Sequence, residues 1–121
     1  MTRIVKLTRI GAWLAVATII VLSVVPSHMR PVVLGNDYAE HFTAYLIAGG
    51  LFAIGSQLSA LSSGALLAIS AGSLELVQLW IPGRFASAGD FAAGAIGAWI
   101  GLVVIVVVRR ARERMFVASY K

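Results

Sequence analysis

The side chains best suited to chemistry include a row of three on one predicted helix. Asp37, His41 and Tyr45 are spaced four residues apart, and residues with that spacing stack along one face of a helix. A histidine beside a carboxylate can accept and return a proton as a general base and acid. Asn36 or Asp37 is the expected N-cap, and acids such as Glu40 are favoured in a first turn. Helix capping could therefore explain Asp37 and Glu40 without any functional role, but it does not explain why His41 and Tyr45 continue the same face inward.

Glu75 is an ionisable residue inside an apolar segment, seven residues before Pro82. At a helical rise of 1.5 Å per residue, this spacing predicts that Glu75 lies about 10 Å inside the helix end. A charged side chain at the centre of a membrane helix costs roughly 2.5–3.5 kcal/mol, and less nearer the interface. We therefore expect Glu75 to face the bundle interior and to have a partner. Its alternative roles are a structural link between helices and a contact to substrate or metal. Gln78 shares its face and can form hydrogen bonds.

The segment 82–90 supplies a third group of polar side chains. Its Pro-Gly pair favours a turn, which would bring Arg84 back over the helix ends. Arg84 is a candidate to neutralise an acid or to bind an anionic head group, and a simple interfacial position is the alternative. Ser87 or Asp90 is the expected N-cap of the next helix. His28 lies between prolines and is expected at the surface.

These residues are compatible with three kinds of chemistry. Carboxylates and imidazole are ligands of divalent metals, a His–carboxylate pair can transfer protons, and the same groups can bind a polar head group. No recognised metal-binding or nucleophile motif chooses among them, so a divalent metal is an open alternative for the cofactor. The catalytic candidates are His41, Glu75 and Asp90, which should then lie within about 6 Å of one another. The predicted binding residues are Asp37, His41, Tyr45, Glu75, Gln78, Arg84 and Asp90.

The composition of the chain indicates a membrane protein. Of its 121 residues, 60% are apolar and only 12% are charged, whereas soluble domains average about 25% charged residues. The lipid bilayer is therefore the expected partner of most of the chain. The net charge of +5 comes from basic tails that flank apolar segments, which indicates membrane topology and not nucleic-acid binding. The absence of cysteine excludes disulfides and thiolate chemistry.

Four apolar segments are close to the roughly 20 residues that a membrane-spanning helix needs. They cover residues 10–25, 42–58, 66–81 and 91–108, and a small polar turn at 59–64 joins the second to the third. The sequence therefore predicts an all-α protein, a single domain of four transmembrane helices over residues 1–121. Basic tails place both termini on the cytoplasmic side of the membrane, by the positive-inside rule. The first segment is expected to be retained, because no small-x-small cleavage pattern follows it.

Glycines on two of the segments predict close helix packing. Gly97 and Gly101 form a GxxxG pair, and Gly64, Ala68 and Gly72 repeat the spacing. Small residues four apart allow helix backbones to approach closely in lipid. The pattern leaves open whether these faces pack the bundle internally or join the chain to a second copy of itself.

The polar residues, taken together, resemble the VanZ-like family of small bacterial membrane proteins. The resemblance covers residues 36–101. The matching elements are Asp37…His41-Phe42…Tyr45, Leu74-Glu75-Leu76-Val77-Gln78, Pro82-Gly83-Arg84…Ser87…Asp90, and Gly97. This chain has Tyr38 where the family pattern usually has lysine, and Gly94 where it usually has asparagine. The family is named after a protein linked to resistance to the glycopeptide antibiotic teicoplanin, so the resemblance implies a cell-envelope role.

The sequence thus favours a membrane protein whose outward polar site binds an envelope component, such as a lipid-linked or anionic head group or a glycan precursor. Binding would then affect glycopeptide susceptibility. The alternatives are a metal- or His/carboxylate-dependent hydrolase or transferase that acts on an envelope lipid, and a structural or regulatory membrane subunit.

Overall fold

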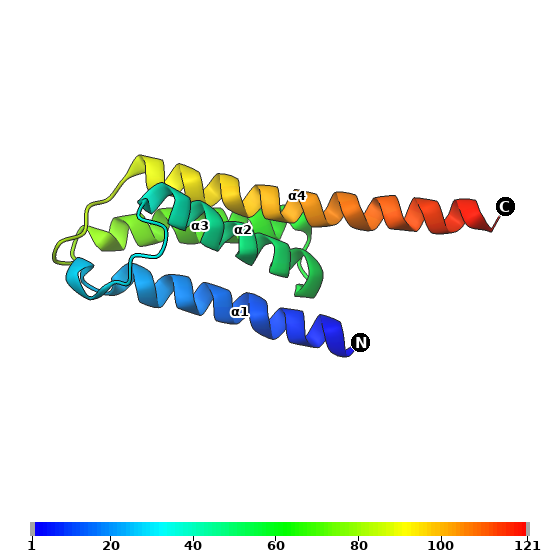
Figure 1. The fold of residues 1–121 in the computed structure, drawn as a ribbon, viewed down its shortest axis with the longest axis horizontal. Coiled ribbons are helices and arrows are strands. Elements are labelled where there is room, and N and C mark those ends of the chain that lie inside the picture. Colours follow the sequence, from blue (N-terminus) through cyan, green and yellow to red (C-terminus); the bar gives the residue numbers. More distant parts are fainter. Residues whose placement is uncertain (1, 121) are drawn as a thin grey trace.

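The computed structural model describes residues 2–120 as a bundle of four α-helices and one short 3₁₀ helix, without strands in that range. The α-helices are α1 (Arg3–Val24), α2 (Asp37–Gly55), α3 (Ala60–Gln78) and α4 (Ala88–Ser119), and the 3₁₀ helix η1 is Ser27–Met29. The start of α1 and the end of α4 point to the same side, opposite the loops that follow α1 and α3 (Figure 1). The predicted all-helical fold is confirmed.

Three of the described helices, α1, α3 and α4, are long and apolar enough to cross a membrane. These helices identify the chain as a membrane protein. The second predicted segment corresponds to α2, whose first turns contain Asp37, Glu40 and His41 and are therefore less apolar. α2 packs mainly against α4 and α1, and α3 packs mainly against α4. The helix with the most polar start thus lies inside the bundle.

Side-chain caps fix the starts of three helices. Asn36 accepts a hydrogen bond from the backbone N–H of Ala39 (3.2 Å) at the start of α2. Ser87 accepts one from the N–H of Asp90 (3.2 Å) at the start of α4. Both caps are among those that the sequence predicted. Each satisfies a backbone donor that has no partner within its own helix.

The predicted turn at 59–64 is wrong, because α3 already begins at Ala60. Ser59 is its N-cap and accepts a hydrogen bond from the N–H of Ser62 (3.0 Å). A serine followed by small residues therefore starts the helix instead of forming the turn. The connection between α2 and α3 is only residues 56–59, which still produces an antiparallel hairpin.

The end of α3 also differs from the prediction. α3 stops at Gln78, and residues 79–81 form tighter turns in which each N–H bonds to the carbonyl three residues earlier. Pro82 disfavours helical geometry in the residue before it, and Gly83 completes the turn with a φ of 73°. Glu75 therefore lies in the last turn of α3, about 4.5 Å from its end and not about 10 Å.

Both basic tails are helical. α1 begins at Arg3, and α4 continues to Ser119, well beyond the predicted end of the last segment at residue 108. Arginine, alanine, glutamate and methionine favour helix, and they dominate residues 109–115. The second half of α4 extends past the rest of the bundle (Figure 1).

Glycines allow α2 and α4 to pack with their backbones in close contact. A Cβ added at Gly97 would overlap the carbonyl oxygen of Phe42, and one at Gly101 would overlap that of Leu46. On the opposite helix, a Cβ at Gly49 would overlap the carbonyl oxygen of Ala98. The GxxxG face of α4 is therefore used inside the bundle. Gly64 and Gly72 likewise face the Trp99 and Phe91 rings of α4.

Candidate functional site

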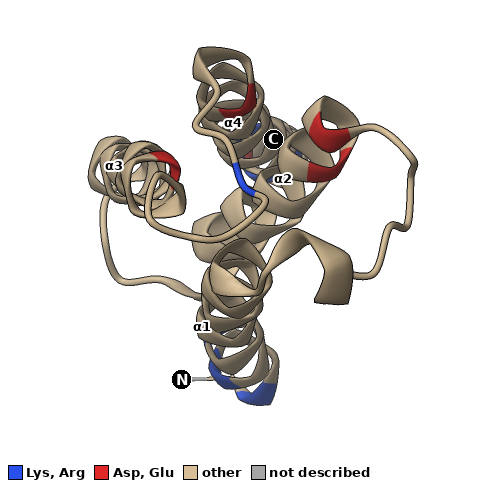
Figure 2. Ribbon diagram, turned by 90° about the vertical axis from the view of Figure 1, so that its left-hand side faces the viewer, with Lys and Arg blue, Asp and Glu red and all other residues tan. Residues whose placement is uncertain are grey.

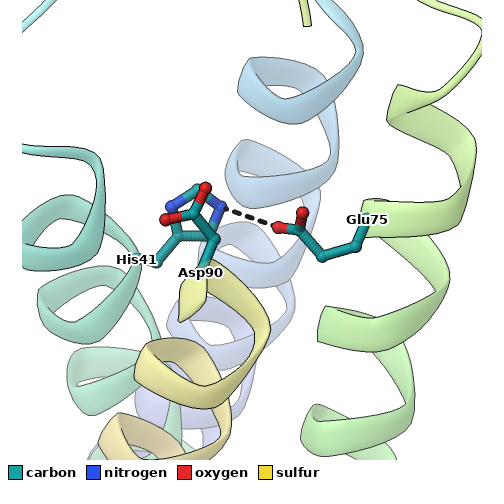
Figure 3. Close-up of side chains that lie close together, drawn as sticks. All are labelled: His41, Glu75 and Asp90. Carbon is teal, nitrogen blue, oxygen red and sulfur yellow. Dashed lines mark ion pairs between the residues drawn. The ribbon is translucent and has the colours of Figure 1, made fainter. Parts of the chain in front are cut away.

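The ends of α2, α3 and α4 bring His41, Glu75 and Asp90 together. His41 lies in the second turn of α2, Glu75 in the last turn of α3 and Asp90 in the first turn of α4. Potential ligand atoms of the three residues all lie within 4.8 Å of one another. Their side chains point toward a common centre (Figure 3). This convergence agrees with the spacing expected from the sequence.

Glu75 and Asp90 are both buried, with 7% and 8% of their surface exposed. Glu75 Oε1 lies 3.5 Å from Nε2 of His41, and its Oε2 accepts a hydrogen bond from the backbone N–H of Ser87 (2.8 Å). The loop before α4 therefore folds back onto the end of α3. Asp90 Oδ1 is buried without any hydrogen-bond partner.

The orientation of the His41 ring is set by the backbone of its own helix. Its Nδ1 lies 2.9 Å from the carbonyl oxygen of Asp37. Because a carbonyl oxygen only accepts hydrogen bonds, Nδ1 must carry the proton that is shared with it. The other nitrogen, Nε2, faces Glu75 (Figure 3). A neutral His41 therefore presents the lone pair of Nε2 on the side of Glu75.

Arg30 is the residue that sequence reasoning missed. Its guanidinium forms ion pairs with Asp37 (3.1 Å) and with Glu40, and its side chain is only 12% exposed. Glu40 also accepts hydrogen bonds from the backbone N–H groups of Val33 (2.9 Å) and Leu34 (3.0 Å). Glu40 and Arg30 thus fasten the loop between α1 and α2 to the start of α2. The sequence signal that could have predicted these ion pairs was Arg30 itself, the single Lys or Arg of the loop, which is followed by the acids Asp37 and Glu40.

Arg84 and Gln78 both bind the end of α1. Arg84 donates hydrogen bonds to the carbonyl oxygens of Val25 (3.1 Å) and Leu22, and Gln78 donates one to that of Ser23 (3.2 Å). Leu22 and Ser23 lie in the last turn of α1 and Val25 is its C-cap, so their carbonyls have no partner within the helix. Burial, and secondarily the charge of Arg30, lower the pKa of the Arg84 guanidinium. Arg84 thus has a structural role besides those predicted for it.

Tyr45 lies deeper than the other predicted residues and belongs to the core. It is 1% exposed, and its hydroxyl lies 3.3 Å from Oγ of Ser70. The hydroxyl of Ser70 donates its hydrogen to the carbonyl oxygen of Leu67 (2.7 Å). In the hydrogen bond between Tyr45 and Ser70, Tyr45 is therefore the donor. Asp37, by contrast, has a side chain that is 65% exposed and bound to Arg30.

Two cavities meet at this end of the bundle. The first, which we call the vestibule, has a volume of about 550 Å³ and is lined by polar residues that include Asp37, His41 and Asp90. The second, which we call the groove, has a volume of about 410 Å³ and is lined mainly by apolar side chains of α1 and α2, with Tyr45 among them. Four residues line both cavities: Arg30, His41, Gln78 and Arg84.

The charges around these cavities are unevenly distributed. Acidic residues of α2, α3 and α4 gather at the end of the bundle that faces the viewer in Figure 2, together with a basic residue of the loop before α4. The bases of α1 that Figure 2 colours lie far from them. His28 is exposed and lines neither cavity, as predicted.

The two departures from the VanZ-like pattern occupy packed positions. Tyr38 places its ring against Gly89, at the start of α4, and a Cβ there would overlap the ring. A Cβ at Gly94 would lie 2.9 Å from the Tyr45 ring. An asparagine at position 94 would therefore require that ring to move.

Comparisons with protein-family models, with curated proteins and with solved structures find no match for this chain.

Proposed function

We propose that this chain is a four-span inner-membrane protein of the VanZ-like family, whose outward site binds the anionic head group of an envelope lipid. The family assignment rests on the residues quoted above. Basic tails at one end of the bundle support a cytoplasmic position for both termini. The loops after α1 and α3 then face outward, and with them the vestibule. α2 is the fourth span, and its polar first turns lie at the outer interface.

The observation that carries the proposal is the junction between the two cavities. A polar vestibule and an apolar groove share Arg30, His41, Gln78 and Arg84. An amphiphile with its head in the vestibule and its chain in the groove would match both surfaces. Each cavity has a volume within the range of about 300–1,000 Å³ that is usual for ligand pockets.

Arg84 is the group at the junction that is suited to an anionic head group. Arg84 binds two backbone carbonyls through two of its N–H donors, and a guanidinium has five. Its remaining donors and its charge are suited to a phosphate. The glycan precursors of the envelope are also carried on lipid phosphates, so they belong to the same ligand class.

The proposal is tested by lipid binding to the purified protein, measured by native mass spectrometry. The probes are phosphatidylglycerol, a polyprenyl phosphate and the zwitterionic lipid phosphatidylcholine. Ala44→Trp fills the groove, because Ala44 lines it, and Ala92→Trp is the matched control on an exposed face of α4. We expect the anionic lipids to bind at least tenfold more tightly than phosphatidylcholine, and only Ala44→Trp to abolish binding. Equal binding of all three lipids, or equal behaviour of the two variants, would contradict the proposal.

The same pair of variants tests the envelope role. If bound lipid connects this protein to glycopeptide susceptibility, expression of the native chain changes the inhibitory concentration of teicoplanin and expression of Ala44→Trp does not. Identical inhibitory concentrations at equal membrane abundance would refute this part of the proposal.

Hydrolysis or group transfer on the bound lipid is a second candidate function. It is favoured by the position of His41 Nε2, which lies 3.5 Å from a buried carboxylate and beside the vestibule. Release of a head group from the probe lipids would be followed for the native protein, for His41→Ala and for His28→Ala. Turnover that persists in His41→Ala would rule out the assigned residue.

A further inference from the structure

We propose that His41, Glu75 and Asp90 bind one divalent metal ion at the base of the vestibule. The residues come from three helices, and potential ligand atoms of all three lie within 4.8 Å of one another. Ligands held about 2.1 Å from a tetrahedral metal lie roughly 3.4 Å apart. The 3.5 Å between His41 Nε2 and Glu75 Oε1 already matches this spacing. A small movement of Asp90 would complete the set.

The hydrogen bond of His41 prepares its ring to bind a metal. Histidine ligands commonly donate their second N–H to a carbonyl or carboxylate, which fixes the tautomer and the ring orientation. Here Nδ1 donates to the carbonyl oxygen of Asp37 (2.9 Å). Nε2 is thereby left as the ligand atom and faces the carboxylate of Glu75 (Figure 3).

Neither carboxylate is in direct contact with a lysine or arginine within residues 2–120, although Arg84 acts electrostatically on both of them from a distance. Arg30 forms its ion pairs with Asp37 and Glu40, and Arg84 donates hydrogen bonds to backbone carbonyls at the end of α1. No lysine or arginine forms an ion pair with either Glu75 or Asp90 in the described range. Two adjacent buried carboxylates without a directly paired cation are energetically unfavourable.

Two independent features strengthen the need for a cation. Asp90 is more than nine-tenths buried, and its Oδ1 has no hydrogen-bond partner. Glu75 lies in the last turn of α3, where the helix dipole is unfavourable for a negative charge. Asp90, in the first turn of α4, has the favourable position. Helix position thus accounts for Asp90 but not for its unpartnered Oδ1, and it does not account for Glu75.

One imidazole and two carboxylates favour Zn²⁺ or Mn²⁺ over Ca²⁺, which prefers oxygen ligands. Three protein ligands leave at least one coordination position open. Since His41 and Asp90 both line the vestibule, the open position would face that cavity. If the proposed lipid function holds, a phosphate oxygen of the head group would fill this open coordination position. Only the identity of that fourth ligand rests on the proposed function; the metal site itself does not.

The metal site is tested first without lipid. Tag-free protein is treated with a chelator in detergent and titrated calorimetrically with Zn²⁺ and with Mn²⁺. We expect one ion per chain, and at least hundredfold weaker binding in Glu75→Gln and Asp90→Asn. His28→Ala removes an exposed histidine and should leave the affinity unchanged. Binding that is absent from the native protein at millimolar metal, or unchanged in Asp90→Asn, would overturn the inference.

Thermal unfolding guards against variants that merely misfold. Metal should raise the Tm of the native protein and not that of Asp90→Asn, while in the metal-free state Asp90→Asn should have the higher Tm because it lacks a buried charge. A proton shared between His41 and Glu75 is the competing explanation, and it predicts no effect of metal on either protein. Phosphatidylglycerol binding is then measured with and without chelator. Lipid binding by a native protein that binds no metal would refute the metal site and leave the proposed function intact.

Discussion

The contact between α2 and α4 makes opposite predictions for two adjacent glycines. A Cβ added at Gly49 would overlap the carbonyl oxygen of Ala98. A Cβ added at Gly50 would lie 3.8 Å from the side chain of Ile105, which is an ordinary van der Waals contact. Both positions are within α2, so alanine improves the intrinsic helix propensity equally at each. The pair Gly49→Ala and Gly50→Ala therefore isolates the packing effect.

The expected magnitudes follow from these two environments. Replacement of glycine by alanine inside a helix gains about 1 kcal/mol in propensity. Overpacking costs about 1–3 kcal/mol, and the upper value applies at Gly49 because a helical carbonyl cannot rotate away. Gly49→Ala should thus lose about 2 kcal/mol, and Gly50→Ala should gain about 1 kcal/mol. For a chain of this size, the difference of about 3 kcal/mol corresponds to roughly 12 °C in Tm.

The assay is thermal unfolding of the two variants in the same detergent, with lipid or metal binding as a second readout. Gly49→Ala should also weaken binding, because separation of α2 from α4 moves His41 away from Asp90. Gly50→Ala should bind as the native protein does. If both variants had the same Tm, α2 and α4 would not be in backbone contact at Gly49, and the packing argument would be refuted.

Three other side chains give predictions of their own. Ser87→Ala removes the cap of α4 and should cost about 1 kcal/mol, seen as a lower Tm. Gln78→Leu leaves the carbonyl of Ser23 without its buried donor and should cost about 1–3 kcal/mol, measured in the same way. Arg30→Gln frees Glu40, so the backbone amides that Glu40 holds should exchange hydrogen at least tenfold faster by mass spectrometry.

Each of these variants has a matched control elsewhere in the chain. Ser73 and Gln57 are exposed, so Ser73→Ala and Gln57→Leu should leave the Tm nearly unchanged. Arg3→Gln, in the N-terminal tail, should not alter exchange in the loop between α1 and α2. A control that matched its test variant would show that composition, and not the assigned contact, causes the effect.

Much of the helical arrangement was predictable because it depends on local rules. Long apolar segments predicted the helices, and the caps Asn36 and Ser87 followed from residue type at helix starts. His41, Glu75 and Asp90 were expected to meet because each is a polar residue at the same end of an antiparallel bundle. Short connections leave few ways to arrange such helices.

The failures concern interactions between segments that are distant in the sequence. Arg30 and Arg84 have long side chains, and their targets depend on loop conformations that no local pattern specifies. The early end of α3 results from the turn at Pro82-Gly83, which tightens the chain before the proline is reached. The GxxxG pattern predicted close packing, but it did not identify α2 as the partner.

The unbroken length of α4 is sufficient to connect the two sides of a membrane mechanically. Its 32 residues span about 48 Å, which exceeds the hydrocarbon thickness of about 30 Å. Residues 102–119 contain neither proline nor glycine, the usual causes of a kink. This half of α4 should therefore transmit an axial force with little bending. An axial force on the basic end of α4, for example from a change in bilayer thickness, would therefore reach the interlocked contact of α4 with α2 and strain the position of Asp90 relative to His41 and Glu75.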